Sequence, residues 1–162
     1  MSGARHDWLA PSLSLLIALV LAVLPLPGAI SAFWPDWVAV VLLYWSLISP
    51  RSFGLLTAVW MGLVLDTLSG ALLGQHALAL LLIVYLSQRF YLRIRVFPIL
   101  QLTMCGVGLL SLYEFILFWV DGVAGRTVPI IERLAPVLTG SVLWILILLV
   151  FERGRQDAQA RI

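Results

Sequence analysis

Long apolar runs, separated by short polar breaks, follow one another along almost the whole chain. A helix needs about 17–25 mostly apolar residues to cross the hydrocarbon core of a bilayer. Proline and arginine mark many of the breaks, and proline is typical of positions next to a helix end. The pattern predicts six membrane-spanning helices, at about 8–26, 34–49, 53–68, 76–90, 97–120 and 136–151.

The composition points to lipid as the solvent of this chain. Of its 162 residues, 62% are apolar and only 11% are charged, whereas a soluble domain carries about 25% charged residues. We therefore expect an all-α fold, with residues 1–162 forming a single transmembrane domain as a polytopic six-helix bundle. The single cysteine, Cys105, cannot form an internal disulfide and is expected to be a small buried side chain.

The first apolar run has the outline of a signal peptide, because small residues follow it at 28–32. Asp7 weakens the positive region that should precede such a signal. We expect this run to be the first transmembrane helix.

All ten basic residues are arginines, and their distribution predicts the orientation in the membrane. If the N-terminus is cytoplasmic, eight arginines fall inside and only Arg126 and Arg133 fall outside, as the positive-inside rule favours. Six spans then place both termini in the cytoplasm of a bacterium, with the chain in its inner membrane. The arginines at the inner loops are the predicted topology determinants: Arg51, Arg89, Arg93 and Arg95. Cytoplasmic docking remains an alternative role for the last three, and no nucleic-acid site is expected.

Small residues recur every four positions through the third span and beyond. The row consists of Gly54, Ala58, Gly62, Asp66, Gly70 and Gly74. Residues four apart stack as a ridge on a helix, and small ridges allow close helix packing in lipid. The row drifts by about 40° per step, so no straight helix presents all of it to one partner. We predict a packing seam from Gly54 to Asp66 and a turn or helix restart from Gly70 to Gly74. The seam serves either the chain's own bundle or another protein.

Two carboxylates, Asp66 and Glu114, are predicted at membrane depth in the outer half of the bilayer. A charge at the bilayer centre costs about 2.5–3.5 kcal/mol on insertion scales, so such residues normally face the bundle interior or a wet cavity. The spans themselves contain no arginine to pair with them. The possible donors are Thr67, Ser69, Gln75, His76, Ser111 and Tyr113, with Arg126 and Arg133 reaching down from the outer loop. A structural role, capping glycine-rich backbone or binding a partner, is favoured over a proton relay or a catalytic pair.

The sequence has no phosphate loop, metal-ligand cluster or nucleophile triad. We therefore predict no catalytic residue, no metal site and no cofactor, and we expect that the protein is not an enzyme.

Two motifs carry a resemblance to a known family. The segment WPDWVAVVLLYWSL covers residues 34–47 and opens with Pro35, Asp36 and Trp37. The segment GLVLDTLSGALLG covers residues 62–74, and Ser69 completes its Gly-x-x-x-Asp-x-x-Ser-Gly-x-x-x-Gly pattern. Together with the length and the six-span layout, they resemble the rod-shape-determining protein MreD family, of the proteobacterial type.

The resemblance implies a non-enzymatic subunit of the elongation machinery, or elongasome, that keeps rod-shaped bacteria cylindrical through lateral peptidoglycan synthesis. It implies binding to the single-span protein MreC. It also implies indirect association with the actin-like MreB, the glycosyltransferase RodA and its transpeptidase partner. The implied fold is similar to that of the substrate-binding S-components of vitamin importers. On the physical side, we hypothesise that the span of MreC docks near the periplasmic half, on the third and fifth segments.

Two other functions stay open. The first is a small-molecule binding or transport subunit of S-component type, and the second is a membrane-embedded hydrolase, for which the sequence offers no catalytic groups. A deep outer cavity lined by Asp66, Gln75, His76 and Glu114 would favour small-molecule binding. A closed bundle with an exposed glycine groove would favour a scaffold.

Overall fold

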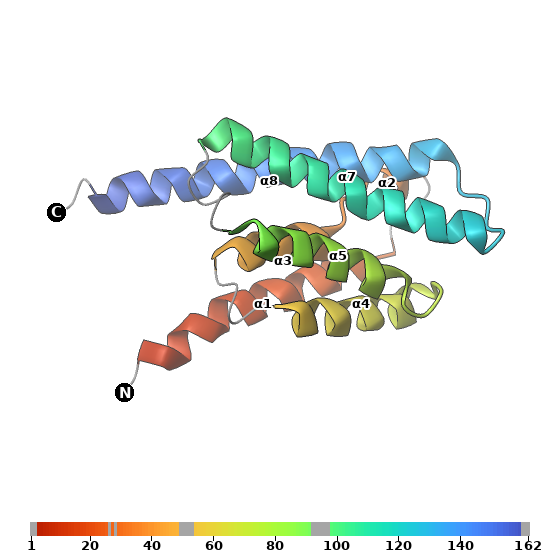
Figure 1. The fold of residues 1–162 in the computed structure, drawn as a ribbon, viewed down its shortest axis with the longest axis horizontal. Coiled ribbons are helices and arrows are strands. Elements are labelled where there is room, and N and C mark those ends of the chain that lie inside the picture. Colours follow the sequence, from red (N-terminus) through yellow and green to blue (C-terminus); the bar gives the residue numbers. More distant parts are fainter. Residues whose placement is uncertain (1–2, 26, 28, 49–53, 92–97, 160–162) are drawn as a thin grey trace.

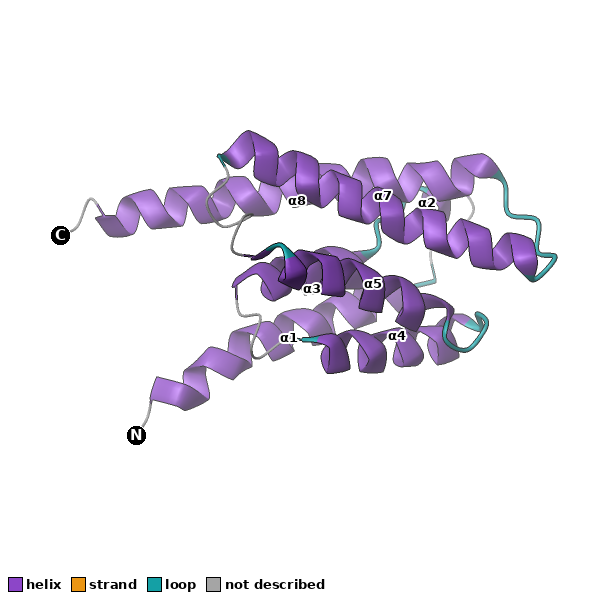
Figure 2. Ribbon diagram, in the orientation of Figure 1, coloured by secondary structure: helices purple, strands orange, loops and turns teal. Residues whose placement is uncertain are grey.

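The computed structural model describes residues 3–25, 27, 29–48, 54–91 and 98–159, and this part of the chain is helical without any strand (Figures 1 and 2). The helices are α1 (Gly3–Val23), α2 (Ala29–Ala32), α3 (Trp37–Ile48), α4 (Leu55–Ser69), α5 (Gln75–Arg89), α7 (Ile99–Val123) and α8 (Ile130–Gln159).

The six longer helices correspond one to one to the six predicted segments, whereas the four-residue α2 was not predicted. Helix α8 ends at Gln159, well past the predicted end at 151, and α1 begins at Gly3, before the predicted start at 8. The bounds between the last two segments differ as well. Helix α7 continues to Val123, past the predicted end at 120, and α8 begins at Ile130, well before the predicted start at 136. Pro136 therefore lies inside α8 and does not start it.

The long helices alternate in direction along the bundle. Helix α1 begins, and α8 ends, at the same end of the molecule, where α3 and α5 also end and α4 and α7 begin (Figure 1). The opposite end carries the α4–α5 turn at 70–74 and the α7–α8 turn at 124–129, and we call it the turn end. An even number of alternating helices therefore puts the start of α1 and the end of α8 on one side.

Helices α3 and α5 form the centre of the bundle. Helix α3 packs against α1 and α5, while α5 also packs against α4 and α7, and α7 packs against α8. Seven of the twelve residues of α3 are buried, among them Val40, Leu42 and Leu43 with no exposed surface. The run Ala79, Leu80, Ile83 and Val84 of α5 is equally buried. Helix α3 is nearly all apolar, as expected of a helix that protein covers on most sides. Helix α5 keeps one exposed side, which carries Leu78 and Tyr85.

The outward faces of the other helices are also apolar. On α4, Leu56 and Trp60 are 78% and 67% exposed, and on α7 Trp119 is 65% exposed. Soluble proteins rarely expose contiguous apolar surface on this scale, so these faces suit lipid or another protein.

Two helical stretches are long and apolar enough to cross a membrane by themselves, Ile99–Val123 and Arg133–Val150. The apolar stretches Leu9–Val23, Trp37–Ile48 and Leu55–Ser69 are shorter. Helix α3, with 12 residues, extends only about 18 Å at 1.5 Å per residue, against a core of about 30 Å. Among the described residues, the length criterion thus supports two of the six predicted spans.

Two glycines set how closely the helices approach. An added Cβ at Gly106 of α7 would lie 2.0 Å from Nε1 of Trp144, a fully buried side chain of α8. An added Cβ at Gly62 of α4 would lie 2.2 Å from Cα of Ala77 of α5. Only glycine permits contacts this close, because any Cβ would overlap the neighbouring helix. Small residues at the interface are typical of helix packing in lipid.

Candidate functional site

The turn between α4 and α5 is closed by the backbone of Asp66 and by two glycines. Gly70 ends α4 in the left-handed region at φ 64°, and Gly74 precedes α5 at φ 98°. The carbonyl oxygen of Asp66 accepts a hydrogen bond from the N–H of Ala71 at 3.1 Å. Glycine adopts positive φ without a Cβ penalty, which makes it the preferred residue at such helix ends.

The side chain of Asp66 closes the same turn from inside. Its Oδ2 accepts a hydrogen bond from the N–H of Gly74, and its Oδ1 accepts one from the N–H of His76, each at 2.8 Å. The ring Nδ1 of His76 also lies 2.8 Å from Oδ1. Asp66 is 1% exposed. A carboxylate at the start of α5 satisfies N–H groups that have no partner within the helix, and it lies at the favourable end of the helix dipole.

The small-residue row therefore serves contacts within this chain along part of its length. Ala58, Gly62 and Asp66 are buried, and Gly62 faces the backbone of α5. Gly54 precedes the first residue of α4 as its N-cap. Ser69 is exposed, and its hydroxyl donates to the carbonyl of Leu65 at 2.6 Å. A partner-binding role for the remaining, uncovered part of the row stays a prediction.

A second group of polar side chains joins α5, α7 and α8 at the turn end. Arg133 of α8 forms ion pairs with Asp121 and, at 3.4 Å, with Glu114, both on α7. Gln75 of α5 donates to Oδ1 of Asp121 at 3.1 Å. Both carboxylate side chains are buried, with 6–7% exposed. Buried charges are stable only when they are paired and hydrogen-bonded, so these contacts tie the three helices together.

The structure gives each of the two acids predicted at membrane depth a basic partner from outside its own helix. Asp66 pairs with His76, and Glu114 pairs with Arg133. Both partners are among the possible donors predicted from the sequence, whereas Asp121 was not predicted to take part. Asp121 lies seven residues, or about two turns, after Glu114 and so shares its helix face. It was missed because the predicted span ended at 120 and left it in a loop.

The segment that leads into α3 brings a fourth acid to this region. The indole N–H of Trp34 donates to the carbonyl of Leu21, near the end of α1, at 2.8 Å. The carbonyl of Asp36 accepts the N–H of Val40 in the first turn of α3, while the Asp36 side chain lines a cavity. Pro35 and Trp37 flank Asp36, and Trp37 packs against the core. The Pro35–Asp36–Trp37 motif thus places the Asp36 carboxyl group at the turn end.

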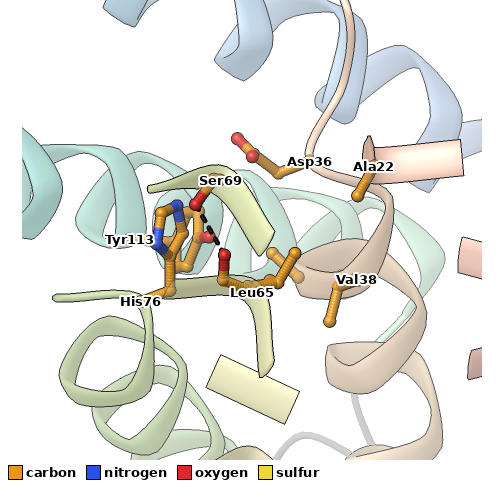
Figure 3. A pocket seen from close by; sticks show the side chains of 8 residues that line it. Ala22, Asp36, Val38, Leu65, Ser69, His76 and Tyr113 are labelled. Carbon is orange, nitrogen blue, oxygen red and sulfur yellow. Dashed lines mark hydrogen bonds between the residues drawn. The ribbon is translucent and has the colours of Figure 1, made fainter. Parts of the chain in front are cut away.

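A small cavity of about 80 Å³ lies between these elements. Its polar lining consists of Asp36, Ser69, His76 and Tyr113, and its apolar lining of Ala22, Val38, Ala39 and Leu65. Asp36 lies on one side, with Ser69, His76 and Tyr113 on the other (Figure 3). Of the four residues proposed to line an outer cavity, only His76 does so.

The predicted topology arginines contribute nothing to this site. Arg51, Arg93 and Arg95 lie outside the described residues. Arg89 is exposed at the end of α5, away from the turn end. Within the described residues, no group of three or more His, Cys, Asp or Glu side chains has the geometry of a metal site.

The apolar exterior and the buried charged side chains at one end define a helical membrane protein whose polar residues connect helices. A family model for rod shape-determining protein MreD matches residues 4–153. The chain belongs to this family of membrane proteins, which carries a rod-shape-determining role.

A curated relative, Rod shape-determining protein MreD of Haemophilus influenzae, is 37% identical over 79 residues. The aligned region covers 49% of this chain and 49% of the relative, so the match spans about half of each. No solved structure matches the chain.

Proposed function

We propose that this chain is a non-enzymatic, multi-pass subunit of the bacterial inner membrane that acts in the cell-elongation complex. Its role there is to bind MreC and thereby support cell-shape control and lateral peptidoglycan synthesis. MreB, RodA and the transpeptidase partner of RodA are connected to it indirectly. The observation that carries this proposal is the match to the MreD family over residues 4–153.

The proposed orientation has both termini in the cytoplasm and the turn end at the periplasmic face. The arginine distribution favours it, because eight of the ten arginines then lie inside. The arrangement of the described helices supports it as well, since α1 begins and α8 ends at the end opposite the 70–74 and 124–129 turns. The buried polar side chains then lie near the periplasmic surface.

The proposed docking face for the span of MreC includes α4 and α7. These helices flank α5 and pack against it (Figure 1). A single span that touches both must therefore cover the outward side of α5, where Leu78, Leu82 and Tyr85 are 53%, 37% and 49% exposed. An apolar surface of this kind suits a transmembrane helix, which associates by close packing.

Within the described residues, the volume of the cavity beside Tyr113 fits a subunit that binds other proteins better than a small-molecule subunit of S-component type. Sites for drug-sized ligands occupy roughly 300–1,000 Å³, whereas the cavity beside Tyr113 measures about 80 Å³. Asp66, Gln75 and Glu114, which a binding site was expected to use, are engaged with protein groups.

Depletion in the native rod-shaped bacterium tests the proposal, combined with purification of the tagged protein and its membrane partners. We expect depleted cells to become round and MreC to copurify with the tagged chain. Cells that stay rod-shaped, together with a purified chain that carries no MreC, would contradict the proposal.

A further inference from the structure

The acids at the turn end outnumber the bases available to them. The described acids of this region are Asp36, Asp66, Glu114 and Asp121, and the bases that contact them are His76 and Arg133, whereas Arg126 of the same end is exposed. Arg133 is occupied by Glu114 and Asp121, and His76 by Asp66. Within the described residues, Asp36 forms no ion pair with a base.

The carboxyl group of Asp36 is also not used to cap its own helix. An aspartate before a helix usually accepts hydrogen bonds from N–H groups of the first turn. Within the described residues, no such bond joins the Asp36 side chain to α3, although its carbonyl accepts the N–H of Val40. The side chain instead lines the cavity.

Tyr113 supplies a second, independent sign that the cavity takes a polar ligand. The residue is 1% exposed and lines the cavity opposite Asp36 (Figure 3). No hydrogen bond of its hydroxyl group lies within the described residues, and its ring lies 6.4 Å from that of His76. Polar groups of buried side chains nearly always have a partner, and a ligand in the cavity can supply one to this hydroxyl.

The size and opening of the cavity restrict that ligand. A volume of about 80 Å³ equals two or three water molecules at about 30 Å³ each. The rim is accessible, because Ser69 is exposed and the side chain of His76 is 17% exposed. A small cationic group that enters from the turn end fits both the volume and the excess of acid.

We propose that this cavity binds the ammonium or guanidinium end of one basic side chain of the partner protein, from the segment that leaves the membrane beside the turn end. Asp36 is the charge that this group pairs with, and the Tyr113 hydroxyl is a neutral acceptor for it. Arginine and lysine side chains bear long apolar stems, which suit the apolar lining of Ala22, Val38 and Leu65. This inference rests on the proposed function. It adds the ion pair that would fix the position of the partner's helix along this bundle.

The test uses the full chain, co-expressed with MreC and purified in detergent, with the dissociation constant as the readout. Asp36→Asn keeps the shape of the side chain and removes its charge. Loss of one partner of a buried charge pair predicts a roughly 30-fold or larger weakening. Asp36→Lys should abolish binding, and a scan of Arg→Glu and Lys→Glu changes in the periplasmic juxtamembrane segment of MreC should yield one that restores it.

Melting temperatures of the purified variants separate misfolding from lost docking, and Arg126→Asn, at an exposed site of the same end, is the matched surface control. Unchanged affinity of Asp36→Asn would overturn the inference, because binding would then not depend on a cation that pairs with the Asp36 charge. Failure of every charge swap in MreC to rescue Asp36→Lys would overturn it too. Either result leaves the proposed function intact, whereas wild-type protein that does not bind MreC at all would contradict the proposed function itself.

Discussion

Replacing Gly62 by alanine should separate α4 from α5. The added Cβ would lie 2.2 Å from Cα and 2.4 Å from N of Ala77, both backbone atoms that no rotamer change can move. Carbon atoms in contact prefer about 3.5–4.0 Å, so the helices must move apart locally by about 1.3–1.8 Å. Asp66 lies one turn further along, and its 2.8 Å hydrogen bonds to α5 would stretch towards about 4 Å, beyond hydrogen-bonding range.

The cost of this change combines two effects. Overpacking of a tight interface costs about 1–3 kcal/mol, and hydrogen bonds to a charged group contribute about 1.5–3 kcal/mol each. Because partial adjustment shares the strain between them, we expect about 3 kcal/mol in total. For a chain of this size, that free energy corresponds to a fall in melting temperature of about 6–12 °C.

Thermal unfolding in detergent measures this fall, and Gly108→Ala is the matched control. Gly108 lies within helix α7, is exposed and has no atom within 4 Å of an added Cβ. Alanine there should leave the melting temperature unchanged or raise it, because alanine favours helix by up to about 1 kcal/mol. Equal melting temperatures for Gly62→Ala and the wild type would refute the close contact between α4 and α5.

Three further predictions concern the turn end. Asp66→Ala, which removes every hydrogen bond of the carboxylate, should lower the melting temperature and the recovery of MreC more than Asp66→Asn, whose amide oxygen keeps part of them. Equal and total loss in both variants would instead indicate a requirement for the ionised group. Arg133→Met leaves two buried carboxylates without their cation and should cost about 3–5 kcal/mol, whereas Arg126→Met at an exposed position should stay within about 0.5 kcal/mol. Similar thermal shifts for these two variants would contradict the buried ion pairs. Gly70→Ala should cost about 1–2 kcal/mol because φ there is positive, and Gly70→Asn should cost less; a Gly70→Ala variant as stable as wild type would show that the turn does not need this conformation.

The sequence predicted the order of the helices well, because long apolar runs with proline or glycine breaks carry a strong local signal. It also indicated the α4–α5 turn, since the row of small residues from Gly54 to Gly74 drifts by about 40° per step and no straight helix can present all of it to one partner. The all-helical class is what the structure shows. The resemblance to S-components is supported by no solved structure.

The polar contacts at the turn end were harder to predict, because they depend on residues far apart in the sequence. Asp121 interacts with Gln75, 46 positions away, and with Arg133, 12 positions away. An aspartate after an apolar run reads as the start of a loop, but here these partners neutralise its charge and α7 continues to Val123. Likewise Pro136 resembles a helix start, yet α8 begins earlier, and its first turns place Arg133 beside α7.

The cavity could not be predicted from the sequence either. Its lining comes from five separate elements, α1, the lead-in and start of α3, α4, α5 and α7, and no local pattern reports on their convergence. Asp36 was selected only as part of a family motif. Its position in the lining of the cavity, together with Tyr113, gives that motif a physical role.

Site-specific photo-crosslinking in living cells tests most directly whether this chain holds MreC on the proposed face. A crosslinking residue at Leu78, exposed on α5 near the turn end, is compared with one at Val20 of α1 and one at Leu138 of α8, which are also exposed. We predict that MreC is captured from Leu78 and not from the other two positions. Consistent capture from Val20 and Leu138, without capture from Leu78, would contradict the proposed docking face.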